Sequence, residues 1–312
     1  MRLQIVTPAP PGSRHGNRHT ALRWASHLRG LGHRVSIATG WRGAAADALI
    51  ALHARRSHAA AAAWKRKHPE RRLIVVLTGT DLYRDIRSDR DAKASLDLAD
   101  RLVVLQEEGL EELKPAHRRK ASVIHQSVPR VRRVPPAKDR FLVTVIGHLR
   151  EEKDPFCAAR ALAHLKAEDL RVVQLGKAMS EAMAREARRL MKRHARYRWL
   201  GELPHAGALR WLARSHAMVI SSRMEGGAHV VSEAIAAGVP VLASRIPGNI
   251  GLLGKSYPGY YAVGNDRALA KLIARARRDP AFLALLEKAV KARRPLTRPE
   301  AERSALRALL AP

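Results

Sequence analysis

Short apolar segments alternate with helical segments along almost the whole chain, and this alternation constrains the fold more than any other feature. The expected strands are 3–6, 35–38, 48–52, 73–77 and 102–105, then 141–146, 172–175, 199–200, 218–221 and 239–243. The expected helices are 17–31, 54–67, 155–166, 179–194, 207–215, 228–237, 265–277, 281–292 and 299–310. The run Leu73–Leu77 is entirely apolar, which is typical of a strand buried on both faces. The pattern predicts parallel sheets covered by helices on both sides.

A segment rich in proline and arginine, residues 128–138, divides the strands into two series. The length of 312 residues suits two domains at about 150 residues each. We therefore predict an α/β protein with two doubly wound, Rossmann-like domains, residues 1–137 and 138–295. Ligands of such folds bind beyond the carboxyl ends of the strands, so we expect both domains to face a central cleft there.

Cysteine content and hydropathy indicate the cellular compartment of the protein. One cysteine, Cys157, excludes an internal disulfide and fits a reducing compartment. All apolar runs fall short of the roughly 20 residues of a transmembrane helix. Residues 1–7 become apolar too early and too briefly for a signal peptide. We expect a soluble, cytoplasmic protein.

The formal net charge of +30 leaves three explanations open. It can reflect an arginine-rich coding bias, binding of anionic small molecules or lipid headgroups, or binding of nucleic acid. The basic residues are spread over many segments, few aromatic residues lie among them, and no nucleic-acid motif is present. We therefore expect no specific nucleic-acid partner, whereas weak contact with a membrane surface remains open.

The most distinctive motif runs from Glu225 to Ala243 and combines two carboxylates, two glycines and a short helix followed by a strand. Glycines allow a ligand to approach the backbone, and the start of a helix favours a phosphate. A carboxylate such as Glu233 has two acceptor oxygens, which suits the vicinal diol of a ribose. The motif predicts a nucleotide-sugar site, and the alternative is a solvated acidic pair at a helix start.

Three further polar segments follow expected strands. Residues 12–18 bring glycines, a hydroxyl and two arginines to a loop that could hold an anion, although it lacks the dinucleotide pattern of glycines. Residues 147–155 place Lys153 where an ammonium could meet a pyrophosphate. Residues 78–81 add two hydroxyls and a carboxylate. For residues 12–18 the alternative is an ordinary connection, for residues 147–155 it is a solvated charge cluster, and for residues 78–81 it is a turn.

Together these motifs resemble glycosyltransferase family 4, whose members have the two-domain GT-B architecture. The resemblance covers nearly the whole chain, and the pair Glu225-x7-Glu233 is its most specific part. It implies that the final helix, within 296–312, joins the first domain. It also implies a catalytic group of Lys153, Glu225 and Arg150. The donor site that it implies consists of Gly16, Gly147, His148, Lys153, Gly226, Gly227, Ala228, His229, Val230 and Glu233.

Each of these donor residues takes a role from the residue that it matches in the family. Lys153 would contact the phosphates, Glu233 would hold the ribose, and Glu225 would lie near the sugar. Gly16 would approach the diphosphate from the first domain. No separate cofactor is expected, because the UDP-sugar is itself a substrate.

The chain departs from the ordinary family pattern at three places. Residues 225–229 read Glu-Gly-Gly-Ala-His in place of Glu-Gly-Phe-Gly-Leu, and His148 replaces an arginine. Residues 78–81 stand in for a catalytic histidine that is frequent in the first domain. With these departures the chain is similar to a narrower group, the selenosugar synthases of selenoneine biosynthesis. That group joins selenophosphate to the sugar of a UDP-sugar such as UDP-N-acetylglucosamine.

The chemistry of selenophosphate fits these departures. It is already a strong nucleophile, so a general base is dispensable. Its negative charge calls for hydrogen-bond donors, and leaving UDP can be stabilised by Lys153 and the helix start without a metal. The expected acceptor site consists of Arg14, His15, Asn17, Arg18, Thr78, Thr80 and Asp81. The alternatives are a conventional hexosyltransferase with an alcohol or lipid acceptor, and a non-enzymatic polyanion-binding protein.

Overall fold

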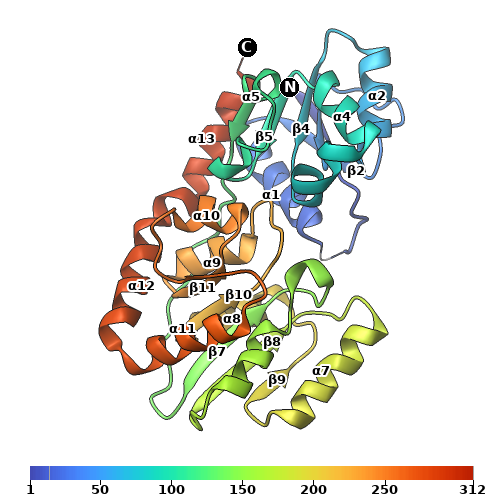
Figure 1. Cartoon of the computed structure of the whole chain (residues 1–312). Helices are drawn as coiled ribbons and strands as arrows, with labels where there is room; N and C mark the ends of the chain where they lie inside the picture. The colour runs from blue at the N-terminus through green and yellow to red at the C-terminus, as the bar shows by residue number, and fades with distance from the viewer. Residues whose placement is uncertain (14, 312) are drawn as a thin grey trace. The chain divides into compact units, whose positions relative to one another are not determined.

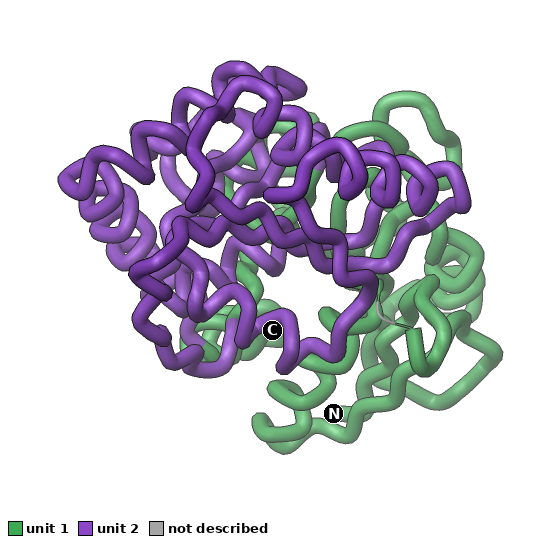
Figure 2. Tube along the Cα trace, turned by 90° about the horizontal axis from the view of Figure 1, so that it is seen from below, with its two compact units in different colours: residues 1–127, 225–227, 299–312 green, residues 128–224, 228–298 purple. Residues whose placement is uncertain are grey.

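The computed structural model describes residues 1–13 and 15–311, and the chain forms two compact units. Unit 1 comprises residues 1–127, 225–227 and 299–312, and unit 2 comprises residues 128–224 and 228–298 (Figure 2). Each unit has its own parallel sheet and its own core, so each is described separately. Among the described residues, no helix combines the length and the apolar character that crossing a membrane requires.

The described part of unit 1 contains a six-stranded parallel sheet in the order β2-β1-β3-β4-β5-β6 (Figure 1). Its strands are β1 (Arg2–Val6), β2 (Arg34–Ala38), β3 (Ala48–Leu52), β4 (Arg72–Val76), β5 (Arg101–Val104) and β6 (Ala121–Val123). The central strand β3 is buried along its entire length. Its side chains alternate between two cores, because Leu49 belongs to one cluster and Ile50 to the other.

Helices cover both faces of this sheet. The longer helices are α1 (Gly16–Gly30), α2 (His58–Lys67), α4 (Arg90–Leu98) and α13 (Pro299–Leu310), and the shorter ones are α3 (Ile86–Ser88) and α5 (Pro115–Arg118). One core contains Trp64 of α2 and Leu96 of α4, and the other contains Trp24 of α1 and Leu306 of α13. The first and last helices of the chain therefore share one core.

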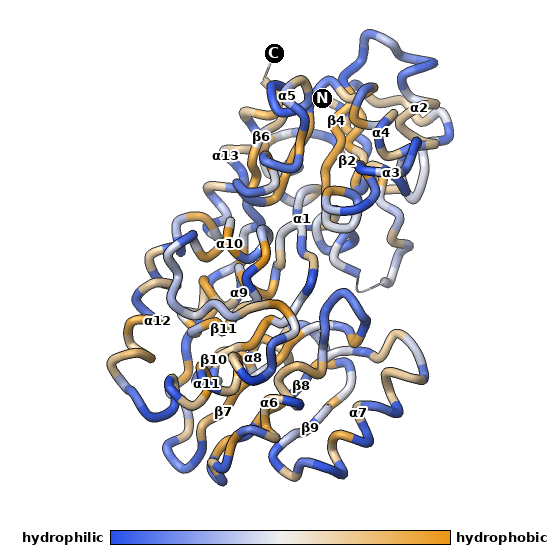
Figure 3. Tube along the Cα trace, in the orientation of Figure 1, coloured by the Kyte–Doolittle hydropathy of each residue, from blue (hydrophilic) through white to orange (hydrophobic). Residues whose placement is uncertain are grey.

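The described part of unit 2 also contains a six-stranded parallel sheet, in the order β12-β11-β10-β7-β8-β9. Its strands are β7 (Phe141–Ile146), β8 (Leu170–Leu175), β9 (Tyr197–Trp199), β10 (Ala217–Ile220), β11 (Val241–Ser244) and β12 (Tyr260–Tyr261). Its helices are α6 (Cys157–Ala161), α7 (Glu181–Arg193), α8 (His205–Ala213), α9 (His229–Ala237), α10 (Pro247–Leu253), α11 (Asp266–Arg278) and α12 (Pro280–Ala292). The strands are mostly hydrophobic, whereas α7 is largely hydrophilic (Figure 3).

The structure confirms the predicted α/β fold with two parallel sheets and helices on both faces. Helix α9 ends where expected, because Gly238 takes a left-handed φ of 73°. The helix predicted from residue 54 begins later, at His58, because His53 has a φ of 76° and a turn follows it. The elements β6, β12, α3, α4, α5 and α10 were not predicted, and all of them except α4 have seven residues or fewer.

Candidate functional site

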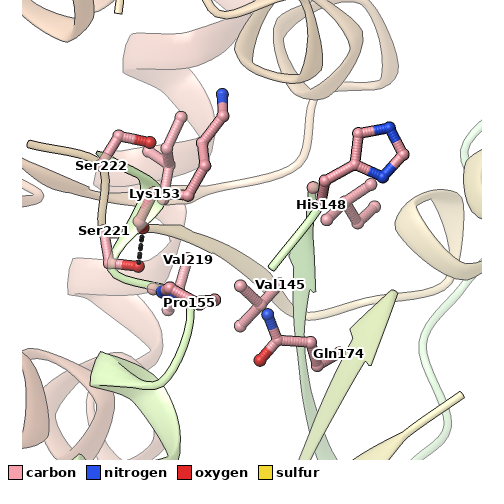
Figure 4. Close-up of a pocket in the computed structure, with 11 residues that line it drawn as sticks. Val145, His148, Lys153, Pro155, Gln174, Val219, Ser221 and Ser222 are labelled. Atoms are coloured by element: carbon pink, nitrogen blue, oxygen red, sulfur yellow. Dashed lines mark hydrogen bonds between the residues drawn. The ribbon is translucent and has the colours of Figure 1, made fainter. Parts of the chain in front are cut away.

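A pocket in unit 2 lies where strands β7, β8 and β10 end at their carboxyl side (Figure 4). Val145 and Val219 contribute apolar surface from two adjacent strands. His148, Lys153 and Ser222 add polar groups from the loops that follow the strands. This is the edge of the sheet at which ligands of doubly wound folds bind.

The loop after β7 is held by a close approach of two backbones. A Cβ atom on Gly176 would lie 1.9 Å from the carbonyl oxygen of Gly147, so only glycine fits there. Backbone hydrogen bonds then join Leu149 to Lys177 at 2.9 Å and to Met179 at 3.0 Å. His148 therefore has a fixed backbone position at the rim of the pocket. Arg150 follows it, is exposed and begins a short turn.

Lys153 is the last residue of that turn, and the side chain of Ser221 holds its backbone in place. The hydroxyl of Ser221 donates hydrogen bonds to the carbonyl oxygens of Lys153 at 3.1 Å and Asp154 at 2.8 Å. Asp154 has a left-handed φ of 39°, and its carboxylate accepts a hydrogen bond from Arg160 at 2.9 Å. The Lys153 ammonium lies on the far side of the residue from the Ser221 hydroxyl (Figure 4). An ammonium so placed can contact a phosphate at the pocket.

Gln174 is a pocket residue that sequence reasoning missed. It lies in strand β8, in which the other polar residue, Arg171, is exposed, and it is itself 1% exposed. The Tyr197 hydroxyl donates to its Oε1 at 3.0 Å, which leaves the amide NH₂ group as a buried donor without a partner among the described residues. A polar side chain in the run Leu170–Leu175 was the available signal. An unpaired buried donor that lines a pocket suits an acceptor atom of a ligand or a water.

Glu233 lies in the middle of α9, is 5% exposed and accepts two hydrogen bonds on one oxygen. His205 Nε2 lies 2.6 Å and His229 Nδ1 3.1 Å from Oε1. Burial alone would raise the pKa of Glu233, but the hydrogen bonds and charges of the two histidines lower it to about 2. Glu233 is therefore an ionised, held carboxylate, which excludes the alternative of a solvated acidic residue. His205 was missed because it lies 28 residues away in another helix.

Glu225, Gly226 and Gly227 belong to unit 1 and pack against its backbone. A Cβ atom on Gly226 would lie 2.5 Å from the carbonyl carbon of Thr78, and one on Gly227 would lie 2.6 Å from Cβ of Leu105. The sequence analysis explained the two glycines by close approach of a ligand, whereas the structure gives close packing within the protein as their reason. Glu225 is 8% exposed, so it too is no solvated residue.

Thr78–Asp81 follow β4, and a histidine that the sequence analysis overlooked lies beside them. His53 directly follows β3, is 3% exposed, and its Nε2 lies 3.1 Å from Oγ1 of Thr80. Burial lowers its pKa, so the imidazole is neutral near pH 7. A histidine therefore lies beside the residues that were expected to stand in for one, and its role stays a matter for the proposals below.

Asp81 is fully buried, and its carboxylate is turned toward backbone amides. It accepts hydrogen bonds from the amides of Thr78 at 3.0 Å, Gly79 at 2.8 Å and Ala54 at 3.0 Å. These contacts hold the loop after β4 against the turn after β3. Asp81 therefore positions the loop that carries the hydroxyls of Thr78 and Thr80. The sequence had suggested instead that Asp81 contacts the acceptor substrate directly.

The loop after β1 leads into α1 and contains the other expected acceptor residues. Arg14 lies outside the described residues. His15 and Gly16 are exposed at the start of α1, and Asn17 is half-buried. Ser13 Oγ and Arg18 Nε are buried and have no hydrogen-bond partner among the described residues. Two unpaired polar groups, one in the loop and one in the first turn of α1, are a feature expected of a site for a polar ligand.

The remaining expected donor residues lie at the start of α9. Ala228 is the buried residue before the helix, and His229 and Val230 are its first two residues and are half-buried. Their backbone amides belong to the first turn, where N–H groups lack partners within the helix. This part of unit 2 can therefore offer amide donors to an anion.

Comparisons with known proteins bear on this arrangement. The family described as "Glycosyl transferases group 1" matches residues 129–294. No curated protein matches the chain in sequence. Anabaena HepE in complex with UDP superposes with a TM-score of 0.81 and 15% identity over 99% of this chain and 98% of that chain. HepE in complex with UDP-glucose gives 0.80 and 15%, with 99% of each chain covered.

A third similar structure is the sucrose-phosphate synthase from Thermosynechococcus elongatus. Its TM-score is 0.78 at 15% identity, over 99% of this chain and 97% of that chain. At these identities the superpositions establish a shared fold, and the particular substrates belong to those proteins.

Proposed function

The chain belongs to the glycosyl transferases group 1 family, and on that premise we propose that it moves a sugar from a UDP-sugar to selenophosphate. UDP-N-acetylglucosamine is the donor to test first. The selenium atom would form the new bond to the anomeric carbon while the bond from that carbon to UDP breaks, and UDP would leave with the electron pair. The first product is a sugar joined through selenium to the phosphoryl group, and hydrolysis of its selenium–phosphorus bond by water would release phosphate and give the 1-selenosugar, a building block for selenoneine, made in the cytoplasm.

The donor half of this proposal rests on unit 2. The pocket at the ends of β7, β8 and β10 offers Lys153 for a phosphate, and the ionised Glu233 offers an acceptor for ribose hydroxyls. The similar HepE binds UDP and UDP-glucose, which supports the same class of donor here. The amide groups that begin α9 would add donors to the diphosphate.

One observation carries the acceptor half: Ser13 Oγ in the loop after β1 and Arg18 Nε in the first turn of α1 are buried and have no partner among the described residues. Burial of an unpaired polar group costs about 1–3 kcal/mol, so such groups are expected to gain a partner on binding. A hydroxyl and a guanidinium both donate to phosphate oxygens, and an anionic acceptor would satisfy them. An uncharged alcohol would leave the guanidinium without an anion.

The chain's own residues would divide the work between binding and chemistry. Lys153 and Arg150 would stabilise the charge that develops on the leaving diphosphate. Glu225 would lie near the sugar. His53 and Asp81 would hold Thr78 and Thr80 in position through the contacts between the ends of β3 and β4. No step in this scheme requires a metal.

A conventional hexosyltransferase with an alcohol or lipid acceptor is the second candidate, and His53 favours it. A neutral imidazole beside a strand end can take a proton from a hydroxyl nucleophile. Selenophosphate has no such need, so the presence of His53 is the strongest argument against the first proposal. The two candidates share the donor site and differ only in the acceptor.

Mass spectrometry of the products separates the two candidates. The enzyme would be incubated with a panel of UDP-sugars, each with selenophosphate, thiophosphate, phosphate or a mixture of alcohols. We expect a mass that corresponds to a sugar linked to selenium, and none with phosphate. A Lys153→Ala protein and a reaction without enzyme are the controls. Products with alcohols alone would establish the conventional hexosyltransferase instead.

A further inference from the structure

The carboxylate of Glu233 has one oxygen that is already occupied. Oε1 lies 2.6 Å from His205 Nε2 and 3.1 Å from His229 Nδ1, whereas Oε2 accepts no hydrogen bond from the described residues. Each carboxylate oxygen offers about two lone-pair positions. Both positions on Oε1 are therefore filled before any ligand arrives.

A ribose has two neighbouring hydroxyls, and the open positions on Glu233 both belong to Oε2. A bidentate contact, with one hydroxyl on each oxygen, requires one histidine to leave Oε1. His205 is the one that can move. It is the first residue of α8, and its side chain is 51% exposed, compared with 26% for His229. Its imidazole can turn into solvent without disturbing a core.

Among the described residues, α9, α8 and the segment before α8 bring titratable or charged groups near His205. Helix α9 packs against α8 and presents Glu233 and His229. Strand β7, which also packs against α8, has no titratable side chain. Helix α8 itself contributes Arg210, and Glu202 lies in the segment before it. Glu233 raises the pKa of the His205 imidazole, by its hydrogen bond first and also by its charge.

We propose that His205 competes with the donor's ribose for Oε1 of Glu233, and that protonation of His205 therefore weakens donor binding. The proposal rests on the assignment of Glu233 to the ribose in the proposed function. His205 then acts as a residue that sets donor affinity through Glu233, without contact to the reacting atoms. His229 stays on Oε1 and keeps the carboxylate oriented when the ribose is bound.

The sign of the pH dependence follows from this competition. The hydrogen bond to Glu233 raises the pKa of His205 above its ordinary value of about 6.5. When the ribose displaces His205, the imidazole returns to its ordinary pKa and releases a proton. Donor affinity should therefore rise with pH from about 6.5 up to the raised pKa, by at most about tenfold per pH unit.

Calorimetric titration with UDP-N-acetylglucosamine tests this inference. UDP is unsuitable, because its terminal phosphate titrates near pH 6. Dissociation constants would be measured across the window for the parent, His205→Gln, His205→Ala and Glu233→Gln proteins. His164→Gln is the matched control, because His164 is an exposed histidine of unit 2 paired with Asp266. Thermal unfolding of each variant checks that the fold is intact.

We expect the parent and His164→Gln proteins to bind more tightly as pH rises, and both His205 variants to show no slope. His205→Ala should also bind more tightly than the parent at the acid end of the window. The opposite slope in the parent, or a slope retained in His205→Gln, would overturn the competition. A slope of the expected sign that disappears in His205→Gln would support it.

A wrong assignment of Glu233 to the ribose would give a different set of dissociation constants. If Glu233→Gln binds the donor as tightly as the parent at every pH, Glu233 does not hold the ribose, and the inference falls with that assignment. If Glu233→Gln binds weakly and His205→Ala also binds weakly at all pH values, Glu233 does hold the donor. In that case His205 assists binding, and the competition alone is wrong.

Discussion

Glu302 in α13 accepts a hydrogen bond of 2.8 Å from the indole nitrogen of Trp24 in α1, so the last helix of the chain is fastened to the first. The same carboxylate lies 2.9 Å from Arg23 Nε and accepts the backbone amide of Ser127 at 2.9 Å. Glu302 is 1% exposed, and all of these contacts lie within unit 1. A buried charge with this many donors holds α13 in one position.

Removal of this carboxylate should destabilise unit 1. Glu302→Ala leaves Arg23 and the Trp24 indole without their partner, and breaking a buried ion pair costs about 3–5 kcal/mol. Urea unfolding followed by circular dichroism would measure the loss in free energy of unfolding. Glu300→Ala is the control on the same helix, because Glu300 is exposed and pairs with the neighbouring Arg303 on the surface. A change of about 0.5 kcal/mol or less in both variants would contradict the assignment.

Acid titration gives a second readout for the same carboxylate. Burial would raise the pKa of Glu302, but hydrogen bonds from His27, Ser127 and Arg23, with the charge of Arg23, lower it to about 2. A depressed pKa stabilises the fold above the unfolded pKa of about 4.3. That contribution is lost as pH falls toward about 2. The free energy of unfolding should fall less steeply in Glu302→Gln than in the parent over this window.

Lys153 is expected to act mainly in the transition state. Charge on the leaving diphosphate grows as the sugar bond breaks, so Lys153→Ala should lower kcat more than it raises the donor KM. Loss of a bond to a charged group corresponds to about 10- to 150-fold in kcat/KM. Steady-state kinetics would measure both constants, with the exposed Lys166→Ala as control. A rise in the donor KM at unchanged kcat would make Lys153 a binding residue only.

Removal of metal ions with EDTA should leave activity unchanged. Inactivation by EDTA would refute the metal-free scheme.

His53 separates the two acceptor classes. Asparagine tolerates the left-handed φ of 76° at this position, and its amide oxygen can replace Nδ1 as acceptor for the Arg56 amide, so His53→Asn should fold normally. Loss of a general base typically costs 10²- to 10⁴-fold, and we expect such a loss only for alcohol acceptors. Turnover with selenophosphate should change by less than about tenfold. A large loss with selenophosphate would show that the acceptor also needs this imidazole.

The fold could be predicted further than the site, and particular residues show why. Apolar runs such as Leu73–Leu77 reveal buried strands, and Gly238 marks the end of α9 by its φ of 73°. Strand β12 has only two residues, so it has no periodicity to detect. Helix α10 contains a proline and two glycines, and it is fixed by the contact of Asn249 with Ser244.

Side-chain contacts between elements were the part that the sequence could not supply. His205 lies 28 residues from Glu233, and His53 lies 27 from Thr80. Parallel topology predicts that strand ends meet, but not which side chains there face each other. His53 directly follows a correctly predicted strand, so its position was available. It was overlooked because the next segment was interpreted as a helix from residue 54.

Arg18 offers the sharpest test of the proposed selenophosphate acceptor. Its Nε is buried without a partner among the described residues, and it lies in the first turn of α1. We expect Arg18→Ala to raise the selenophosphate KM far more than the donor KM, and Arg14→Ala, at a position outside the described residues, to act in the same direction. Free phosphate and thiophosphate should compete with selenophosphate and leave UDP binding unchanged.

The control for Arg18 is another arginine of the same helix. Arg29 lies in the last turn of α1, is exposed and donates to the carbonyl of Val35, so Arg29→Ala should keep both KM values.

Strand β3 separates β1 from β4, so the segment with Arg18 after β1 and the segment with Thr80 after β4 belong to strands that are not neighbours. The kinetic test therefore addresses the loop after β1 by itself. If Arg18→Ala and Arg14→Ala both behave like the parent, the buried guanidinium serves the fold and not an anion. The conventional hexosyltransferase, with His53 as its base, would then be the better account of this chain.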